Sequence, residues 1–408
     1  MKCRHCKKVL SHAFLDLGFA PPSNAYLTEP QLGEPEMYFP LKVNVCDACW
    51  LVQTEDYASA DRLFDKNYAY FSSTSPSWLE HAKSYVEQII PRLKLDEKSF
   101  VIEIASNDGY LLKNFVANRI PCLGIEPTTG TADAAEKLAI PVMREFFGSR
   151  IAEALVKDDK RADLIVGNNV FAHVPDINDF TAGLRRVLKP EGTITLEFPH
   201  FLSLIKGNQF DTIYHEHFSY LSLISVSAIL QKQGLRMWSV EKLSTHGGSL
   251  RLYICHLDSA ISQNGSVLKV LQEEKEFGLS SMKPYASFQQ KANAVKDDFL
   301  SFLINEKRKG KRVAAYGAAA KGNTLLNYAG IKPDLIEFVC DAAISKQNKF
   351  LPGSHIPILP PSALKEKQVD WVVVFPWNLI DEIKRTHAYI SAWGGKFVTA
   401  IPQLVIHE

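Results

Sequence analysis

Residues 101–109 of the chain read Val101-Ile102-Glu103-Ile104-Ala105-Ser106-Asn107-Asp108-Gly109. An apolar run ends here in a turn of small and polar residues, and a helical pattern follows the turn. We predict a strand over Ser99–Ile104 and a helix over Tyr110–Asn118. Such a turn lets backbone amides and a helix N-terminus approach a ligand. The stretch is therefore typical of the first β-α unit of a nucleotide-binding sheet.

The same alternation continues over the next hundred residues. It predicts strands at 121–125, 163–167 and 192–198, and helices at 130–138 and 177–188. Strands that alternate with helices imply a parallel sheet with covered faces. A helix near Ser225–Gln233 follows, and then two strand-like runs flank the turn Gly247-Gly248. These residues belong to one α/β unit.

A second α/β unit starts at residue 312. It follows a long amphipathic helix predicted over 281–306 and a charged linker, Lys307–Lys311. Its predicted elements are a strand at 312–316, a helix at 323–328, and buried strands at 335–340, 371–375 and 397–401. The predicted fold class is therefore α/β.

Length and composition limit the kind of protein. With 408 residues, the chain is long enough for two or three domains. A hydrophobic share of 46% and a charged share of 22% are usual for a soluble globular protein. A formal net charge of +1 argues against a nucleic-acid partner. No apolar run is long enough to span a bilayer and no signal-peptide pattern starts the chain, so we expect a cytoplasmic protein without membrane contact.

Two cysteine pairs mark the N-terminal segment, which otherwise predicts hairpins and loops. Cys3-x-x-Cys6 and Cys46-x-x-Cys49 have the spacing of two zinc knuckles, and a strand over 39–45 runs into the second pair. Four thiolates close the coordination shell, so the zinc is expected to be structural. The alternative is a set of reduced cysteines without a metal. After this segment, Ser75 is a candidate N-cap for a helix that begins at Pro76.

The run Tyr214-His215-Glu216-His217 is the densest group of proton-handling side chains. Histidine titrates near neutral pH, and a neighbouring carboxylate can tune and orient it, so the run favours a catalyst that moves a proton. The alternative is a polar loop whose histidines cap a helix or satisfy buried carbonyls.

The first nucleotide loop is poor in glycine. Ala105, Asn107 and Gly109 stand where three glycines are usual, which weakens the case for a diphosphate-cradling dinucleotide site. Glu126, at the end of the second predicted strand, stands where an acid can accept both ribose hydroxyls of an adenosine. This arrangement resembles class I S-adenosylmethionine-dependent methyltransferases, whose ligand has a ribose and a sulfonium but no phosphate.

Two further segments carry the same resemblance. Residues 167–176, which include Asn168, are similar to the methyltransferase segment after the fourth strand. In that family Phe147 would lie near the adenine, and its alternative is an ordinary core aromatic. His173 is interpreted as a packing or capping residue.

Taken together, the chain resembles the sugar C-methyltransferases that act on nucleotide-linked ketosugars. The motifs are the paired CxxC and the stretches 103–109, 214–222, 245–251 and 316–323. The resemblance covers nearly the whole length and implies two Rossmann-like doubly wound domains preceded by a small zinc-binding domain. We expect a zinc-binding domain at 1–65, a methyltransferase domain at 66–255, a helical linker at 256–310 and a nucleotide-sugar-binding domain at 311–408. The implied cofactors are S-adenosylmethionine and a structural zinc.

The expected chemistry assigns roles to the titratable run. Methylating a carbon beside a ketone needs a base to remove its proton and a donor to stabilise the enolate oxygen. His217 is the predicted base, Glu216 orients it or shares the proton, and Tyr214 donates to the enolate oxygen. The resemblance supports these positions and adds Tyr68, near the methyl donor and the sugar, whose alternative is a core aromatic. His215 should point away if the stretch is extended.

The cofactor site implied by the resemblance consists of Glu103, Ala105, Asn107, Gly109, Glu126, Phe147 and Asn168. A second loop, residues 316–324, follows a strand and opens a helix. Its small side chains expose backbone amides and Lys321 adds a positive charge, which suits a diphosphate. By resemblance it would bind a thymidine-diphosphate-linked ketosugar through Gly317, Ala318, Lys321 and Asn323, with Lys346 after the next strand. Asp341 and His355 either join it or belong to a solvated loop.

Three alternatives remain open at this point. They are a zinc-containing NAD-dependent oxidoreductase, a non-catalytic nucleotide-sugar-binding protein, and an O- or N-methyltransferase. The first is disfavoured by the glycine-poor loop. The sequence does not separate His217 from Glu216 as the proton acceptor. We expect a monomer or a weak oligomer.

Overall fold

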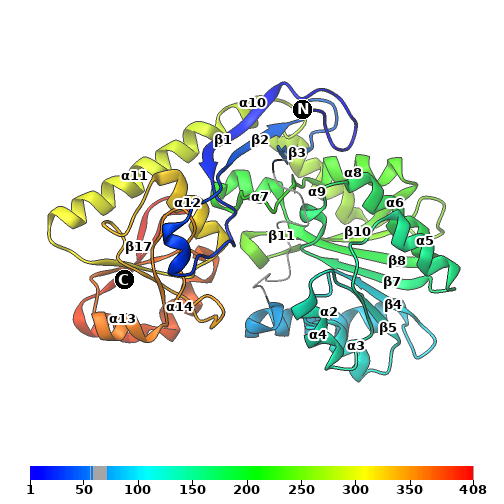
Figure 1. Cartoon of the computed structure of the whole chain (residues 1–408). Helices are drawn as coiled ribbons and strands as arrows, with labels where there is room; N and C mark the ends of the chain where they lie inside the picture. The colour runs from blue at the N-terminus through cyan, green and yellow to red at the C-terminus, as the bar shows by residue number, and fades with distance from the viewer. Residues whose placement is uncertain (56, 58–70, 408) are drawn as a thin grey trace.

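The computed structural model describes residues 1–55, 57 and 71–407. Within them the strands form three sheets, one for the N-terminal unit, one for the central unit and one for the C-terminal unit (Figure 1). Fold class α/β is confirmed. The expected cytoplasmic location is not tested, and no helix of the described chain has the length and apolar character needed to cross a bilayer.

The central sheet has the strand order β10-β11-β8-β7-β4-β5-β6. Its strands are β4 (Val101–Ile104), β5 (Cys122–Ile125), β6 (Val142–Met143), β7 (Ala162–Asn168), β8 (Leu188–Pro199), β10 (Leu235–Leu243) and β11 (Ser249–His256). Strands β6, β5, β4, β7 and β8 are parallel, as the alternation with helices predicts. β11 pairs antiparallel with both β8 and β10, so the sheet is mixed rather than wholly parallel. β10 and β11 are joined by a short turn, which explains why these two neighbouring strands run antiparallel.

Helices cover both faces of this sheet (Figure 1). They are α2 (Pro76–Leu93), α3 (Leu112–Ala117), α4 (Thr129–Glu136), α5 (Ser149–Lys157), α6 (Ile177–Val187), α8 (Leu223–Lys232) and α9 (Gly265–Phe277). The short helix α7 (Phe201–Lys206) packs instead into a cluster with β1 (His12–Ala20) and α11 (Phe288–Arg308). One buried cluster packs α2 and α3 on one face, through Tyr85 and Phe115. Another packs α5, α6 and α8 on the other face, through Leu155, Leu184 and Ile229. Ser75 caps α2 as predicted, since its side chain accepts a hydrogen bond from the amide of Trp78.

The N-terminal sheet has the order β1-β2-β3-β9, with every neighbouring pair antiparallel. Its strands are β1 (His12–Ala20), β2 (Phe39–Val45), β3 (Val52–Thr54) and β9 (Ser219–Tyr220). The predicted strand over 39–45 is therefore confirmed. β9 is contributed by the central unit, immediately after the titratable run, so that run is joined to the edge of the N-terminal sheet.

The C-terminal sheet has the order β14-β13-β12-β15-β16-β17. Its strands are β12 (Val313–Tyr316), β13 (Val339–Cys340), β14 (Ile358–Leu359), β15 (Trp371–Val374), β16 (Lys396–Thr399) and β17 (Val405–His407). All neighbours are parallel except β17, which returns antiparallel. The helices of this unit are α12 (Ala320–Ala329), α13 (Ser362–Lys367) and α14 (Ile380–Thr386). α12 begins three residues before the predicted helix start, which places Lys321 in its first turn.

The long helix predicted over 281–306 is two helices, α10 (Lys283–Ala286) and α11 (Phe288–Arg308), separated at Ser287. α11 also takes up Lys307 and Arg308 of the predicted linker. Its buried residues recur at helical spacing and pack into a cluster shared with β1 and α12. Short 3₁₀ turns complete the elements: η1 (Pro30–Gly33), η2 (Ser72–Thr74), η3 (Phe171–His173), η4 (Phe210–Thr212), η5 (Thr245–Gly247), η6 (Trp377–Leu379) and η7 (Ala388–Trp393).

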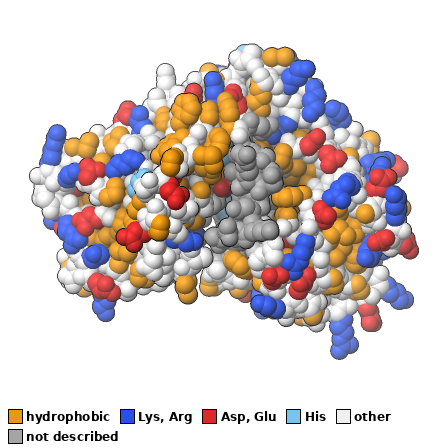
Figure 2. Space-filling view, in the orientation of Figure 1, with side chains coloured by type: hydrophobic (Ala, Val, Ile, Leu, Met, Phe, Trp, Pro, Cys, Tyr) orange, Lys and Arg blue, Asp and Glu red, His pale blue; other side chains and the backbone are white. Residues whose placement is uncertain are grey.

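The visible face in Figure 2 carries acidic and basic side chains side by side. Lysines and arginines are interspersed with aspartates and glutamates over both halves of that face, which agrees with a net charge of +1. This face therefore has no large field of one sign of the kind that would attract a nucleic acid.

Candidate functional site

A cavity of about 500 Å³ lies where the three units meet. Its walls come from the loops after β4, β5 and β7, from the titratable run, and from the first turn of α12. It brings together most of the residues singled out in the sequence: Ala105, Asn107, Glu126, Phe147, Asn168, Tyr214, Glu216, His217, Lys321 and Lys346. The lining formed by the described chain does not include Glu103, Gly109, Gly317, Ala318 or Asn323. Tyr68 lies outside the described residues.

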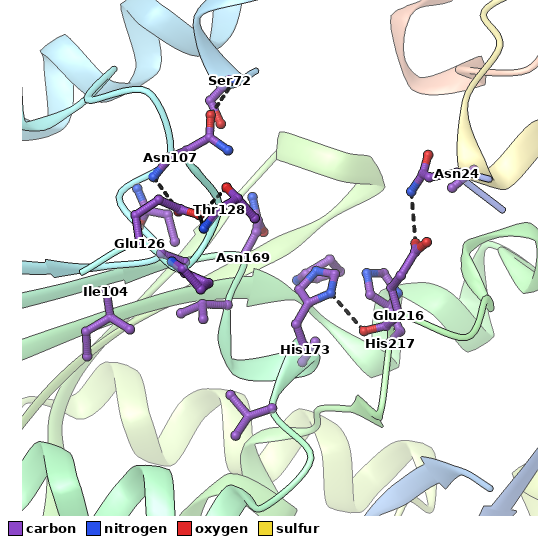
Figure 3. A pocket seen from close by; sticks show the side chains of 18 of the residues that line it. Asn24, Ser72, Ile104, Asn107, Glu126, Thr128, Asn169, His173, Glu216 and His217 are labelled. Carbon is purple, nitrogen blue, oxygen red and sulfur yellow. Dashed lines mark hydrogen bonds between the residues drawn. The ribbon is translucent and has the colours of Figure 1, made fainter. Parts of the chain in front are cut away.

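At one end of the cavity, Glu126 holds two loops together (Figure 3). Its Oε2 accepts from the amide of Asn107 at 2.9 Å and its Oε1 from the amide of Thr128 at 2.9 Å. Asn107 Oδ1 in turn accepts from the amide of Ser72 at 2.9 Å. The hydroxyl of Thr128 also donates to Oε1. A carboxylate has about four acceptor sites, so about one site of Glu126 remains for a ribose hydroxyl.

The loop keeps the backbone conformation that glycines usually provide, although only one of the three positions is a glycine. Ala105, Asn107 and Gly109 all have positive φ, at 56°, 49° and 77°. Only glycine adopts this region without cost, and Asn tolerates it better than other residues. Asn169 and His246, at φ 52° and 54°, add two more such residues to the cavity wall. A residue with such a strained backbone persists only where the surrounding structure holds it in place, and such residues are common at binding sites.

Glu103 is fully buried at the end of β4. Burial, with a smaller contribution from the nearby Glu126 and Asp108, raises the pKa of this carboxyl well above its usual value. Phe147 and Asn168 do line the cavity. Phe147 packs edge-on against Phe180 with ring centroids 5.4 Å apart, so it is both a lining residue and part of a cluster.

The titratable run forms a tight turn, because the amide of His217 donates to the carbonyl of Tyr214 at 3.0 Å. The assumption that the run is extended is therefore wrong. His215 nevertheless points away from the cavity, as expected. Its Nε2 lies 3.2 Å from the carbonyl of Pro40 and its ring packs against Phe39. The turn, and not strand alternation, separates His215 from its neighbours.

His217 is held as a neutral acceptor. Its Nδ1 lies 2.9 Å from the carbonyl oxygen of Thr212, so Nδ1 carries the proton and Nε2 has the lone pair. The ring of Tyr214 lies against it, with centroids 4.0 Å apart, and that of His173 meets it edge-on at 4.6 Å. Burial, reinforced by the nearby His173, lowers the pKa of His217 well below its usual value.

Glu216 has the opposite shift. Burial raises its pKa to about 7, against the effect of hydrogen bonds from Asn24, whose Nδ2 donates to Oε2 at 2.9 Å (Figure 3). The backbone carbonyl of Glu216 accepts from His173 Nδ1 at 2.8 Å. Burial lowers the pKa of His173 to about 4, which keeps this imidazole neutral and supports its interpretation as a packing and capping residue.

Lys321 and Lys346 also line the cavity. Lys321 Nζ donates to Asn378 Oδ1 at 2.9 Å and lies over the ring of Trp377. Lys346 Nζ donates to the carbonyl of Ala318 at 3.0 Å and faces Asp341 at 3.4 Å. Both lysine side chains are therefore part of the cavity lining.

Three residues that the sequence places in or near the second loop lie outside the cavity lining formed by the described chain. Gly317 has φ 90°, and a Cβ there would meet Pro376 at 2.4 Å. Asn323 Nδ2 donates to the carbonyl of Ser23 at 3.2 Å, which ties α12 to the N-terminal unit. His355 makes a similar link, since its Nε2 lies 3.0 Å from Glu36 Oε2.

Several lining residues were not selected from the sequence. Asn24, Ser72 and Asn169 are the clearest examples. Asn24 lies in a loop of the N-terminal unit, where no local pattern distinguishes it. His246 stood in a recognised stretch but was not assigned a role. It accepts from Asn169 Nδ2 at 3.0 Å. The sequence signal for His246 is its place directly before Gly247-Gly248.

The four cysteines of the N-terminal unit converge on one point. Their Sγ atoms lie within 4.8 Å of one another, with Cys3 and Cys49 at 3.6 Å and Cys6 and Cys46 at 3.5 Å. Four thiolates at about 2.3 Å from a tetrahedral zinc would be separated by roughly 3.8 Å, so the arrangement fits that ion. Cys3, Cys46 and Cys49 are buried, which suits a closed structural site.

Comparison with protein families matches three consecutive parts of the chain. Residues 3–64 match a zinc binding domain of a methyltransferase group, residues 78–240 a methyltransferase domain, and residues 244–402 a C-methyltransferase C-terminal domain. The C-methyltransferase NovU of Streptomyces niveus is 31% identical over 402 residues, which are 98% of this chain and 96% of that protein.

Solved structures with a similar region include two methyltransferases. An S-adenosylmethionine-dependent methyltransferase from Clostridium acetobutylicum is 10% identical, with a TM-score of 0.35, and the alignment covers 44% of this chain and 92% of that one. The magnesium protoporphyrin IX methyltransferase of Synechocystis is 14% identical, with a TM-score of 0.34, over 44% and 83% of the two chains. Each alignment covers less than half of this chain.

Proposed function

The chain belongs to the family of S-adenosylmethionine-dependent C-methyltransferases, and we propose that it methylates the carbon beside the ketone of a thymidine-diphosphate-linked sugar. The proposed acceptor is C3 of a 4-keto-deoxysugar, and the proposed route passes through an enolate. The observation that carries the proposal is His217, a buried neutral imidazole whose Nε2 is an acceptor at the cavity. The family assignment replaces the alternatives of an NAD-dependent oxidoreductase and a non-catalytic binding protein.

His217 removes the proton in this proposal. The C–H bond beside the ketone breaks, the proton goes to Nε2, and the electron pair moves onto the ketone oxygen. Nδ1 keeps its hydrogen bond to the carbonyl of Thr212 throughout, so the ring does not have to turn. Tyr214, whose ring lies against His217, donates from its hydroxyl to the enolate oxygen.

Glu216 is assigned to orienting the base or sharing its proton. Its raised pKa of about 7 means that it changes charge near neutral pH, which suits a group that exchanges a proton during turnover. Tyr68, by resemblance, would stand near the methyl donor and the sugar.

The methyl donor would be held by Ala105, Asn107, Glu126, Phe147 and Asn168. S-adenosylmethionine supplies an electrophilic methyl group, whose bond to the sulfonium breaks as the new carbon–carbon bond forms and whose electron pair stays on sulfur. Glu126 would accept a ribose hydroxyl and Phe147 would lie beside the adenine. Glu103 and Gly109 lie outside the lining formed by the described chain, so they would act on the donor only through the loop between them. Holding the methyl group in line with the carbanion is mainly a positioning task.

Lys321 and Lys346 would bind the diphosphate of the sugar donor, since both line the cavity and lysine is a common phosphate ligand. Gly317, Ala318 and Asn323 shape the loop that carries Lys321. We also propose the domain boundaries 1–65, 66–255, 256–310 and 311–408.

Proton exchange tests this proposal directly. The protein is incubated in heavy water with a thymidine-diphosphate 4-keto-6-deoxysugar and an unreactive analogue of the methyl donor, and the ring protons are followed by NMR. We expect enzyme-dependent exchange beside the ketone, reduced at least about a hundredfold in His217→Ala because the base is lost. His12→Ala is the matched control, since His12 belongs to β1, outside the cavity.

Absence of exchange in the unaltered protein would reject the ketosugar acceptor or the enolate route. Exchange that persists in His217→Ala but disappears in Glu216→Gln would move the role of base to Glu216. An enzyme that methylates oxygen or nitrogen would give no exchange of a carbon-bound proton, so the same experiment separates these reaction types.

A further inference from the structure

The N-terminal unit reaches into the proposed active site through Asn24. Asn24 lines the cavity, and its Nδ2 donates to Glu216 Oε2 at 2.9 Å (Figure 3). Glu216 is 3% exposed, so this hydrogen bond is shielded from water and has a stronger effect on the carboxyl group than an exposed one. Donors to a carboxyl group favour its ionised form, so Asn24 opposes the effect of burial.

Tyr26 connects Asn24 to the loop that precedes α12. Its hydroxyl lies 2.7 Å from the carbonyl oxygen of Ala318 and 3.3 Å from Asn24 Oδ1. A phenol has one proton, so Tyr26 donates to one of the two acceptors at a time, and the shorter distance favours Ala318. The Asn24 amide thus has its nitrogen toward Glu216 and its oxygen toward Tyr26.

Lys346 acts on the same carbonyl. Its Nζ donates to the oxygen of Ala318 at 3.0 Å and lies over the ring of Tyr26, 5.6 Å from the centroid. One continuous series of contacts therefore links Lys346, Ala318, Tyr26, Asn24 and Glu216. An anion that draws the Lys346 ammonium away from Ala318 removes one hydrogen-bond donor from the Ala318 carbonyl. Tyr26 is the other donor to this carbonyl, so the hydrogen bond of the Tyr26 hydroxyl changes in response.

The backbone fixes this segment in place from both sides. Asn323 donates to the carbonyl of Ser23 at 3.2 Å. Leu27 and Phe350 exchange two backbone hydrogen bonds, at 2.9 and 2.8 Å. Residues 23–27 are thus attached to the C-terminal unit, while the Asn24 side chain reaches the central one.

We propose that Asn24 is a positioning residue for Glu216, and that Tyr26 couples this pair to Lys346 at the substrate end of the cavity. The inference rests on the proposed function, because it assigns Glu216 to the proton-transfer step and Lys346 to the anionic part of the substrate. The N-terminal unit then takes part in catalysis through a hydrogen-bonded bridge, in addition to holding zinc.

Other titratable groups surround Glu216. His217 follows it in the chain, His173 contacts its backbone carbonyl, and Tyr26 and Tyr220 lie within electrostatic reach of its carboxyl group. Both histidines have lowered pKa values because of burial, and both tyrosines have raised ones for the same reason. Glu216 is therefore the member of this group whose charge changes near pH 7.

The test measures the rate of ketone-dependent proton exchange against pH. Asn24→Ala should lower kcat for exchange about tenfold, leave KM for the sugar nucleotide within about twofold, and shift the acid limb upward by on the order of one pH unit. The limb moves upward because Glu216 loses a donor that favours its carboxylate. Asn44→Ala is the matched control, since Asn44 Nδ2 makes a hydrogen bond of 3.0 Å to Glu55 in the same unit, outside the cavity.

Tyr26→Phe provides the second variant, with Tyr328→Phe as its control, because the Tyr328 hydroxyl interacts with Asn293 away from the cavity. Tyr26→Phe should shift the limb in the same direction by a smaller amount. The double variant Asn24→Ala/Tyr26→Phe should be no slower than Asn24→Ala alone, because both act on one route.

Two results would overturn the bridge. One is an acid limb in Asn24→Ala that coincides with that of Asn44→Ala, and the other is strict additivity of the two substitutions. Exchange in the unaltered protein distinguishes the two levels of the argument. If it is absent, the proposed function fails, whereas if it is present and the variants match their controls, only the bridge fails.

Discussion

At the scale of single residues, Glu126 joins the loops after β4 and β5 through the amides of Asn107 and Thr128. One carboxylate thus shapes the proposed cofactor end and faces the cavity. Its neutral amide analogue would lose both the charge and half of the acceptor capacity.

Glu126→Gln is therefore expected to weaken S-adenosylmethionine binding by about ten- to a hundredfold, or roughly 1.4–2.8 kcal/mol. Isothermal titration calorimetry measures this change in Kd. Glu136→Gln, at an exposed position on α4, serves as the control. An unchanged Kd in Glu126→Gln would show that the ribose is held by other groups.

Glu216 makes stability depend on pH. Its folded-state pKa is raised by burial from 4.5 to about 7, so the stability of the native state declines as pH rises between these values. Below pH 4.5 the carboxyl group is protonated in both folded and unfolded states, and the penalty disappears.

We expect Glu216→Gln to remove this decline. Relative to the variant, the unaltered protein should lose on the order of 3 kcal/mol of unfolding free energy between pH 4.5 and pH 7.5. Urea denaturation at a series of pH values measures the difference, with the exposed Glu97→Gln as control. Parallel curves for Glu216→Gln and the unaltered protein would contradict the raised pKa.

At the scale of elements, the β10–β11 hairpin brings His246 to the cavity and the tip of its turn to the C-terminal unit. Gly247 has φ 86°, and a Cβ there would lie 2.3 Å from the ring of Trp377 in η6. Gly310 has a similar φ of 73°, but a Cβ added there would have no neighbouring atom within 4 Å. Both glycines thus have a positive φ that would strain any other residue, but only at Gly247 would an added Cβ also clash with a neighbouring side chain.

Gly247→Ala should destabilise the protein by about 2 kcal/mol more than Gly310→Ala, because only the first substitution forces the hairpin away from Trp377. Urea unfolding of the two variants gives the difference. Equal losses would mean that strain alone matters and that the contact with η6 relaxes easily.

At the scale of the whole molecule, the N-terminal unit contains the cysteine cluster and is joined to the other two units. Strand β3 pairs with β9 just after the titratable run, and Asn24 reaches Glu216. Loss of zinc should therefore affect both the folding of residues 1–55 and the proposed active site.

Removing zinc with a chelator is expected to abolish exchange activity and to produce a separate unfolding transition at lower temperature. The reason is that structural zinc contributes on the order of 10 kcal/mol to the folding of small domains. Circular dichroism and a colorimetric zinc assay follow the loss. Cys46→Ser should behave in the same way, whereas Cys122→Ser, at a cysteine of β5 outside the cluster, should retain zinc.

The local patterns of the chain determined most of its elements. Apolar runs, helical spacing and the Ser75-Pro76 cap correctly predicted β4, β5, β7, β12 and the start of α2, because these signals depend on residues a few positions apart. The spacing of the cysteines likewise predicted their cluster. The motifs pointed to the family, and the relative at 31% identity over nearly the whole chain confirms it.

Tertiary structure alone decided which of these residues meet. Asn24 and Glu216 are 192 positions apart, and Tyr26 and Ala318 are 292 apart. No periodicity connects such pairs, because their contact depends on how three sheets pack around one cavity. The same holds for the break between α10 and α11 and for the turn at Tyr214–His217. Local sequence sets which conformations are favourable, but the packing of distant elements selects among them.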